Sequence, residues 1–255
     1  MNETNGCRVP PSIPMVCIGI KGVLAQPNEM SELQVIDVGA CPYARALKLQ
    51  EALVDRAIAD ETFPPALVLA EHVPPVITLG RSADAGNVLA SREALAGAGI
   101  EVVSASRGGD VTWHGPGQIV GYPIVRLARR GHDVRQYLRD LEEAILRTAA
   151  RFGISAARRD GLTGVWVGRE KLAAIGVAVR RWVAYHGFAL NVSPDLSGFA
   201  NIVPCGLAGE GVTSMERILD RAVRTAEVKP VLLECLAEVF AFERLVPTEA
   251  SAFGF

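Results

Sequence analysis

A twelve-residue segment rich in glycine and proline restricts the fold more than any other part of this sequence. Residues 107–118 read RGGDVTWHGPGQ, and five of the twelve are glycine or proline. These residues hold the backbone in conformations that regular helices and strands do not use, and glycine also lets a ligand approach closely. Strand-like apolar runs lie on both sides, at 100–104 and 119–125. We expect a binding loop between two strands, although a long turn without a ligand has the same composition.

From residue 33 onward the chain alternates between strand-like and helix-like patterns. Apolar residues at helical spacing predict helices at 42–60, 91–98, 134–152, around Met215 and at 228–240. Short apolar runs predict further strands at 33–38, 66–70, 76–79, 164–167, 171–179 and 183–192. We expect Pro74 and Pro75 to form a turn that joins two of these strands. Hairpins mixed with helices indicate a single α/β domain of the α+β type, in which helices flank a mixed β-sheet.

The two ends of the chain differ from this regular part. Residues 1–32 contain several prolines and show no clear period, so we expect an irregular, disordered extension. A secretory signal is disfavoured, because Pro14 and Lys21 interrupt the apolar stretch 13–25 and only Arg8 precedes it. We place the folded domain at 33–245 and a C-terminal tail at 246–255.

Charge and cysteine content exclude several classes of protein. The net charge is −2, which leaves no electrostatic footprint for nucleic acid, and no apolar run reaches the ~18 residues of a membrane span. The five cysteines are scattered, at 7, 17, 41, 205 and 235, so we expect free thiols in the cytoplasm and neither a zinc site nor a disulfide scaffold. Four lysines stand against 22 arginines, so a lysine in an unusual place is informative.

Three more segments carry candidate chemistry. Lys171 begins a strand of small apolar residues, KLAAIG, although an exposed lysine at a turn has the same appearance. In the segment 185–191, YHGFALN, small and large residues alternate, which leaves room on one face or serves close packing. Cys205 lies between proline and glycine in a turn that can present a nucleophile, whereas most single cysteines are inert.

These four segments, in this order, resemble the octanoyltransferases of lipoate biosynthesis, also called lipoyl(octanoyl) transferases. The family pattern has an RGG-x-x-T-Y-H-G-P-G-Q loop, then K-x-A-(A/S)-(I/L)-G, H-G-x-A-L-N and P-C-G, and the likeness covers roughly residues 35–245. The upstream run 74–81, PPVITLGR, is also similar to the family's. One departure is Trp113, which stands where the family usually has tyrosine, so an aromatic ring is kept and a hydroxyl is lost.

The resemblance implies a single-domain fold shared with biotin and lipoate protein ligases. It also implies that Cys205 is the nucleophile that holds an octanoyl thioester and that Lys171 lies beside it and lowers the pKa of its thiol. The acyl group would then be bound by the glycine-rich segment and by the two strands, through Arg107, Gly108, Gly109, Asp110, Val111, Thr112, Trp113, His114, Ala174, Ile175, Gly176, Gly187, Phe188 and Ala189.

The resemblance also implies which molecules take part in the reaction. The octanoyl or lipoyl group would come from acyl carrier protein and pass to a lysine of the lipoyl domains of 2-oxoacid dehydrogenases or of the glycine cleavage H protein, without a cofactor or metal. Three alternatives stay open: an ATP-dependent lipoate or biotin protein ligase of the same fold, a hydrolase that uses Cys205 with His114 or His186, and a non-catalytic acyl-binding protein.

Overall fold

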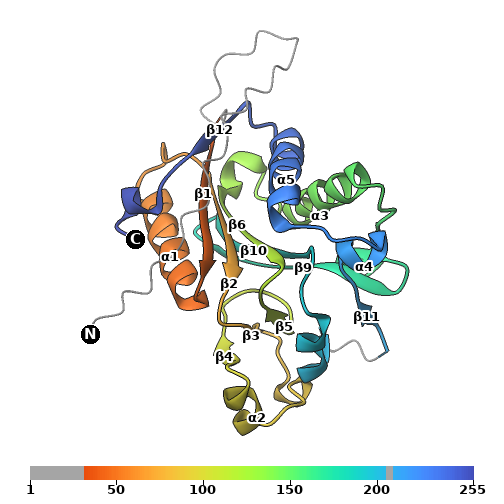
Figure 1. Ribbon diagram of the computed structural model, residues 1–255. Coiled ribbons are helices and arrows are strands. Elements are labelled where there is room, and N and C mark those ends of the chain that lie inside the picture. Colours follow the sequence, from red (N-terminus) through yellow and green to blue (C-terminus); the bar gives the residue numbers. More distant parts are fainter. Residues whose placement is uncertain (1–31, 205–208) are drawn as a thin grey trace, which may run out of the picture.

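The computed structural model describes residues 32–204 and 209–255 and contains two β-sheets (Figure 1). In spatial order, the large mixed sheet consists of β12 (Arg244–Pro247), β1 (Glu32–Cys41), β2 (Ala66–His72), β6 (Gln118–Arg126), β10 (Val183–Asn191), β9 (Glu170–Arg180), β8 (Leu162–Val167) and β7 (Ala157–Arg159), with β11 (Gly211–Val212) paired to β9. The small sheet consists of β4 (Glu101–Ser104), β3 (Val76–Leu79) and β5 (Val111–His114). The expected α/β class, a mixed sheet flanked by helices, is confirmed.

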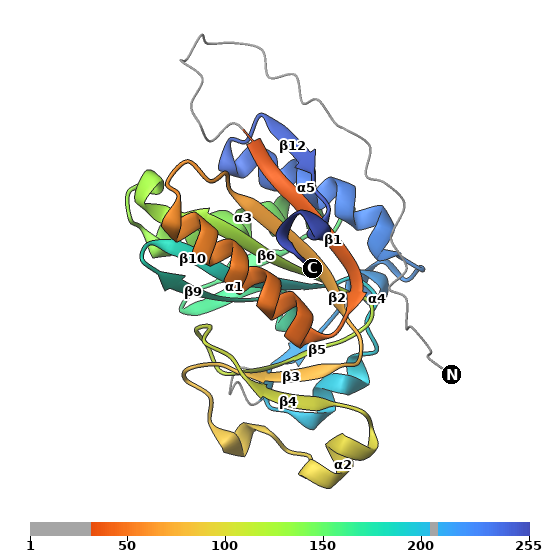
Figure 2. The same ribbon diagram turned by 90° about the vertical axis from the view of Figure 1, so that its left-hand side faces the viewer.

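Helices cover the large sheet on both faces (Figures 1 and 2). Helix α1 (Tyr43–Ala59) lies on one face, and α3 (Val134–Arg151) and α5 (Thr225–Phe240) lie on the other. The short helices α2 (Arg92–Gly97) and α4 (Met215–Leu219) lie outside these layers. The start of α3 is fixed by an N-cap, because the Asp133 side chain accepts a hydrogen bond from the N–H of Gln136. The sequence predicted this cap from the position of Asp133 before the helix.

The sheet separates two apolar cores because neighbouring residues of each strand point to opposite faces. Ala173, Phe188 and Leu190 face α3 and α5, whereas Val120 and Ala189 face α1. Cys235 is fully buried in α5, as its amphipathic helix indicates, and Cys41 is buried at the end of β1. The third core lies under the small sheet and includes Trp113.

The small sheet differs from the expectation in two respects. β5 forms inside the glycine-rich segment, where we expected only a loop, because 111–114 pair antiparallel with β3. Strands β2 and β3 do not pair with each other, since Pro74 and Pro75 carry the chain from the large sheet to the small one. In Figure 2 the small sheet lies below the large sheet, near the end of α1.

Part of the expected C-terminal tail belongs to the folded structure. Val246 and Pro247 lie in β12, whose parallel pairing with β1 extends the large sheet at its edge. Phe253 contacts the Phe63 ring at 6.4 Å between centroids and also lies under the Arg56 guanidinium. Phe253 and Phe255 also pack against the apolar core that α1 shares with the large sheet, so these contacts hold the C-terminal residues. The expected extension 1–32 falls outside the described residues except for its last position.

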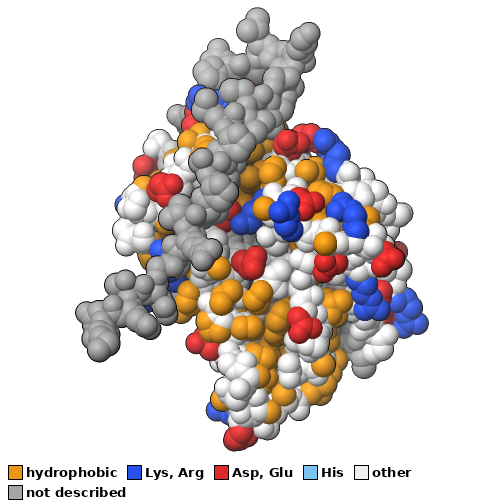
Figure 3. Space-filling view, in the orientation of Figure 1, with side chains coloured by type: hydrophobic (Ala, Val, Ile, Leu, Met, Phe, Trp, Pro, Cys, Tyr) orange, Lys and Arg blue, Asp and Glu red, His pale blue; other side chains and the backbone are white. Residues whose placement is uncertain are grey.

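The face of the molecule drawn in Figure 3 shows no single dominant charge. Lysine, arginine, aspartate and glutamate are interspersed over the upper part of Figure 3, and hydrophobic side chains gather lower down, over the small sheet. None of the helices in the described part of the chain combines the length and hydrophobicity needed to span a bilayer.

Candidate functional site

A cavity lies between the large sheet and the small sheet, and small side chains from three strands form its floor. Ala189 of β10 lies between Val120 of β6 and Ala174 of β9 in the sheet register, and Gly187 pairs with Gly176 two residues further along. Because side chains two residues apart share a face, Ala174 and Gly176 lie on the same side of the sheet as Ala189. Gly187 also lines the cavity, but a Cβ on it would lie 2.2 Å from the Gly121 carbonyl oxygen, so this glycine also serves close packing against β6. The strands thus place four alanines and glycines side by side, which leaves space above them.

The glycine-rich segment covers this floor. Within the segment, the N–H of Gly108 donates a hydrogen bond to the carbonyl oxygen of Val177 on β9, at 2.8 Å. A Cβ on Gly176 would lie 2.9 Å from the Gly108 carbonyl oxygen, so only glycine lets the segment come this close. The turn after β3 is hydrogen-bonded to the same segment. The N–H groups of Gly80, Arg81 and Ser82 donate to backbone carbonyls of the glycine-rich segment.

Arg107 joins the covering segment to the small sheet. Its guanidinium is largely buried and donates to Thr78, at 2.7 Å to the carbonyl oxygen and 2.7 Å to the hydroxyl. A buried guanidinium needs such acceptors because an unpartnered charge is costly in a protein interior. Arg107 therefore positions the segment and adds a positive charge to the cavity wall.

Buried imidazoles and tyrosines complete the wall. Burial lowers the pKa of His186 to about 4, assisted by the charge of Arg107. Burial, with the charges of His72 and Arg107, also holds the pKa of His114 well below its usual range. Both imidazoles line the cavity together with Tyr43 and Tyr122, so the wall offers neutral polar groups at neutral pH.

A chain of hydrogen bonds fixes the orientation of His114. Its Nδ1 lies 3.3 Å from the Oε1 of Gln118, whose amide nitrogen donates to Asn191 at 2.8 Å. Asn191 in turn donates to the Thr213 carbonyl, and the Thr213 N–H donates to the carbonyl of Lys171. Since an amide oxygen only accepts, Nδ1 carries the proton and Nε2 keeps its lone pair.

Lys171 lies in a smaller cavity that adjoins the first. Thr112, Ala174 and Ala189 line both cavities. Lys171 is only 6% exposed, and Pro204, the residue before Cys205 in the chain, lines the same small cavity. Cys205 itself, with 206–208, lies outside the described residues, and so do Cys7 and Cys17.

The structure brings nearly all the expected acyl-site residues to the larger cavity. These are Arg107, Gly108, Gly109, Asp110, Val111, Thr112, His114, Ala174, Ile175, Gly176, Gly187, Phe188 and Ala189. Trp113 is the exception, because β5 turns its side chain to the opposite face. There it packs on the Phe199 ring, 5.2 Å between centroids, and does not line the cavity.

Sequence reasoning missed several lining residues from other elements. Tyr43 comes from α1, Thr78 from β3, and Val120 and Tyr122 from β6. Thr78 lies in the run 74–81, which is similar to the family's but was not assigned to the site, and the other three belong to ordinary amphipathic or apolar runs that no local motif marks. Among the described residues, no three histidine, cysteine, aspartate or glutamate side chains come together in a way that could hold a metal ion.

Comparisons with known proteins agree with this geometry. Residues 42–237 match the family model for the lipoyl protein ligase A/B catalytic domain. The octanoyltransferase of Syntrophotalea carbinolica is 49% identical over 216 residues, which are 85% of this chain and 95% of that protein. The octanoyltransferase of Geobacter metallireducens is 48% identical over 197 residues, 77% of this chain and 88% of that protein.

A solved structure supports the fold independently of sequence. The bipartite lipoate protein ligase of Thermoplasma acidophilum, determined in a study with its E2 lipoyl domain, superposes with a TM-score of 0.65. The match covers 88% of this chain and 90% of that chain, with 16% sequence identity. The architecture is therefore that of a lipoate protein ligase.

Proposed function

The chain belongs to the lipoyl protein ligase A/B catalytic domain family and, within it, to the octanoyltransferases, and on this premise we propose a route for its reaction. As an acyltransferase of protein lipoylation, it takes an octanoyl or lipoyl group from acyl carrier protein. The group passes through a thioester on Cys205 to a lysine of an acceptor lipoyl domain. Acceptors of this kind are those of 2-oxoacid dehydrogenases and the glycine cleavage H protein.

One observation carries the proposal: Lys171 and Pro204 line one small cavity that shares three lining residues with the larger one. Cys205 directly follows Pro204 in the chain. An ammonium beside a thiol favours the thiolate, which is the reactive nucleophile. Lys171 is buried, so the ammonium and the thiolate would act on each other with little screening by solvent.

The first half-reaction is an exchange between thioesters. The Cys205 thiolate attacks the carbonyl carbon of the octanoyl carrier, a new C–S bond forms and the bond to the carrier thiol breaks. The departing carrier thiolate takes a proton from the Lys171 ammonium, which leaves a neutral amine. Two similar thiols exchange one acyl group, so neither ATP nor a metal is required.

The second half-reaction restores the starting state. The acceptor lysine amine attacks the acyl carbonyl, an amide forms and the C–S bond to Cys205 breaks. The neutral Lys171 amine receives the proton that the attacking amine loses, so the thiolate–ammonium pair is regenerated. An amide is more stable than a thioester, which makes this step favourable.

The larger cavity supplies selectivity for the acyl chain. Its floor of Ala174, Gly176, Gly187 and Ala189 offers an apolar slot of small side chains. Burial of about seven carbons at ~0.8 kcal/mol each contributes roughly 5 kcal/mol, which is enough to favour a medium-length chain.

A single incubation with octanoyl-carrier protein, followed by intact-mass measurement, tests the route. We expect the enzyme to gain one octanoyl mass, Cys205→Ser to gain none, and the group to move to a lipoyl domain without ATP. Release as free octanoate would indicate a hydrolase, a requirement for ATP and free acid would indicate a ligase, and binding without an adduct would indicate an acyl-binding protein. Each of these three outcomes would contradict the proposed route.

A further inference from the structure

A β-bulge lies next to Lys171 at the start of β9. Val165 of β8 pairs with Ala173, but the next residue, Trp166, pairs with Lys171, so Leu172 is an extra residue in β9. Bulges of this kind redirect side chains and are frequent beside active sites. The direction of the Lys171 side chain therefore depends on how β8 is held.

Two residues of β8 contact the Lys171 side chain. The Nζ atom lies 4.6 Å from the centroid of the Trp166 ring. Gly164 approaches the stem, since a Cβ on it would lie 3.6 Å from the Lys171 Cε. The φ of Gly164 is 128°, a conformation that glycine adopts readily and other residues rarely allow, and a Cβ there would lie 2.7 Å from the Ala173 carbonyl oxygen, so this close approach of β8 to β9 depends on glycine.

Glu142 of α3 ties Gly164 of β8 to the helix. Its Oε1 accepts a buried hydrogen bond from the N–H of Gly164, at 3.0 Å. Its Oε2 accepts from the Arg139 Nη1 at 2.6 Å and from the Arg158 Nε at 3.1 Å. The carboxylate is fully buried, and a charge is retained in such a place only when it is paired and hydrogen-bonded.

We propose that Glu142 is a positioning residue for Lys171, acting through the N–H of Gly164 and the bulge between β8 and β9. This inference rests on the proposed function, in which the Lys171 ammonium favours the Cys205 thiolate, gives a proton to the carrier thiol and receives one from the acceptor lysine. Glu142 does not take part in the chemistry. It holds Gly164 and Trp166 against the lysine stem, so that the ammonium stands at a fixed place. Catalysis by proton exchange depends steeply on such placement.

Two conservative variants separate positioning from charge balance. In Glu142→Gln the amide oxygen can still accept from Gly164, while Arg139 and Arg158, whose side chains are partly exposed, turn to solvent. In Glu142→Asp the charge remains, but the shorter side chain cannot reach both Gly164 and the arginines. We expect Glu142→Asp to lower kcat about tenfold with little change in KM, and Glu142→Gln to stay within about threefold of the wild type.

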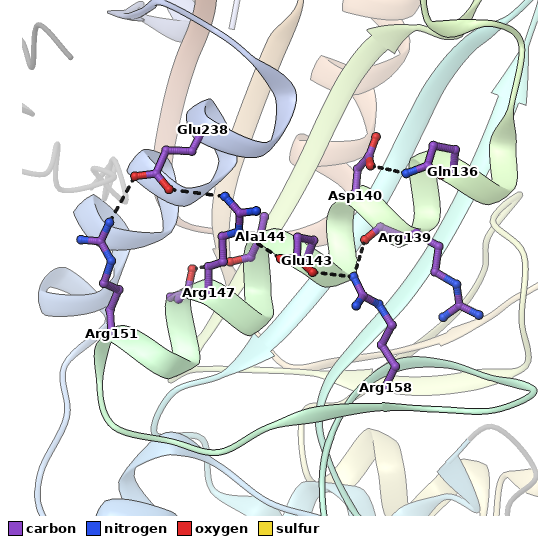
Figure 4. A network of polar contacts seen from close by, with 10 residues as sticks. Gln136, Arg139, Asp140, Glu143, Ala144, Arg147, Arg151, Arg158 and Glu238 are labelled. Carbon is purple, nitrogen blue, oxygen red and sulfur yellow. Dashed lines mark hydrogen bonds and ion pairs between the residues drawn. The ribbon is translucent and has the colours of Figure 1, made fainter. Parts of the chain in front are cut away.

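The neighbouring residue is the matched control. Glu143 is partly exposed, and its carboxylate accepts hydrogen bonds from Arg158 (Figure 4) and Arg147. It shares Arg158 with Glu142, whereas the N–H of Gly164 donates to Glu142. Glu143→Gln removes a carboxylate from the same network, and we expect wild-type kcat. If Glu143→Gln lowered kcat as much as we expect for Glu142→Asp, charge and not positioning would matter. The same would follow if Glu142→Asp were active and Glu142→Gln inactive. Either result would overturn the inference.

A second readout shows whether the effect passes through Lys171. We expect Glu142→Asp to shift the pH profile of Cys205 alkylation by iodoacetamide upward, and to have no further effect on transfer when Lys171→Ala is already present. Equal losses from Glu142→Asp in both backgrounds would assign Glu142 to general stability and overturn the inference. Wild-type transfer by Lys171→Ala alone would instead overturn the role of Lys171 in the proposed function, and the inference with it.

Discussion

The Nζ atom of Lys171 lies 4.6 Å from the centroid of the Trp166 ring, and the Arg159 guanidinium carbon lies 4.8 Å from the same centroid. The face of an aromatic ring attracts a cation more strongly when water is excluded, as it is around the buried Trp166. Arg159 is also held by two hydrogen bonds to Glu210, which offset its charge. The Trp166 ring therefore contacts the Lys171 head group in a place that excludes water.

Lys171→Arg is expected to abolish turnover although it keeps a positive charge. A guanidinium stays protonated at any working pH, so it cannot supply a proton to the carrier thiol and later accept one from the acceptor lysine. We expect transfer to fall at least about a hundredfold, the usual scale of lost acid–base catalysis. Iodoacetamide labelling of Cys205 at neutral pH should nevertheless be faster in Lys171→Arg than in Lys171→Ala. Normal transfer by Lys171→Arg would contradict the proton exchange.

Gly176→Ala is expected to weaken acyl binding. The new Cβ would stand 2.9 Å from the Gly108 carbonyl oxygen and 3.1 Å from the Arg107 Cδ, so the covering segment must move. We expect KM for the octanoyl carrier to rise about tenfold, equivalent to ~1.4 kcal/mol. Gly97→Ala in α2 is the control, because a Cβ there meets no atom within 4 Å, and it should leave KM unchanged. Equal KM values for the two variants would argue against a close-fitting cover.

Trp113→Tyr is expected to keep transfer activity and to lose stability. The indole packs against Phe199 away from the cavity, and its Nε1 is buried without a hydrogen-bond partner in the described structure. A smaller ring leaves a void that costs about 1–2 kcal/mol of unfolding free energy. Urea denaturation and the rate of octanoyl transfer measure the two effects separately. A large drop in transfer with unchanged stability would show that the indole reaches the substrate.

Acidification is expected to destabilise the fold through its buried histidines. Burial lowers the pKa of His72 to about 4, and His186 is lowered to about 4 as well, against 6.5 in the unfolded chain. The unfolded state therefore binds protons first as the pH falls, so stability is full above pH ~6.5 and declines toward pH ~4. By about pH 5 each group should cost roughly 2 kcal/mol of unfolding free energy.

Urea denaturation at about pH 7.5 and pH 5 checks this dependence. His132 is exposed, so His132→Gln should show the same loss as the wild type. Constant stability between the two conditions would mean that the buried imidazoles have the same pKa in the folded and the unfolded chain, which would contradict the prediction.

Local pattern was sufficient for most helices and strands and for the positions of small residues. The Asp133 cap, the amphipathic α1 and the alternation around Gly187 are properties of adjacent residues, and they reappear in the structure. The composition of the glycine-rich segment predicted a binding loop, and the segment lines a cavity, but the pairing of 111–114 with β3 was not expected. That pairing depends on a partner more than thirty residues away, about which the segment's own composition carries no information.

The sequence by itself determined the family, and it predicted the segments and the two residues, Cys205 and Lys171, to which the proposed route assigns the chemistry. Only the tertiary structure decided which side chains meet: that Ala174 lies beside Ala189, that Trp113 turns away from the cavity, and that Glu142 supports the strand beside Lys171. The physical reason is that strand register and helix packing select partners far apart in the chain. A buried carboxylate on α3 looks like any other helical glutamate until the fold brings the N–H of Gly164 to it.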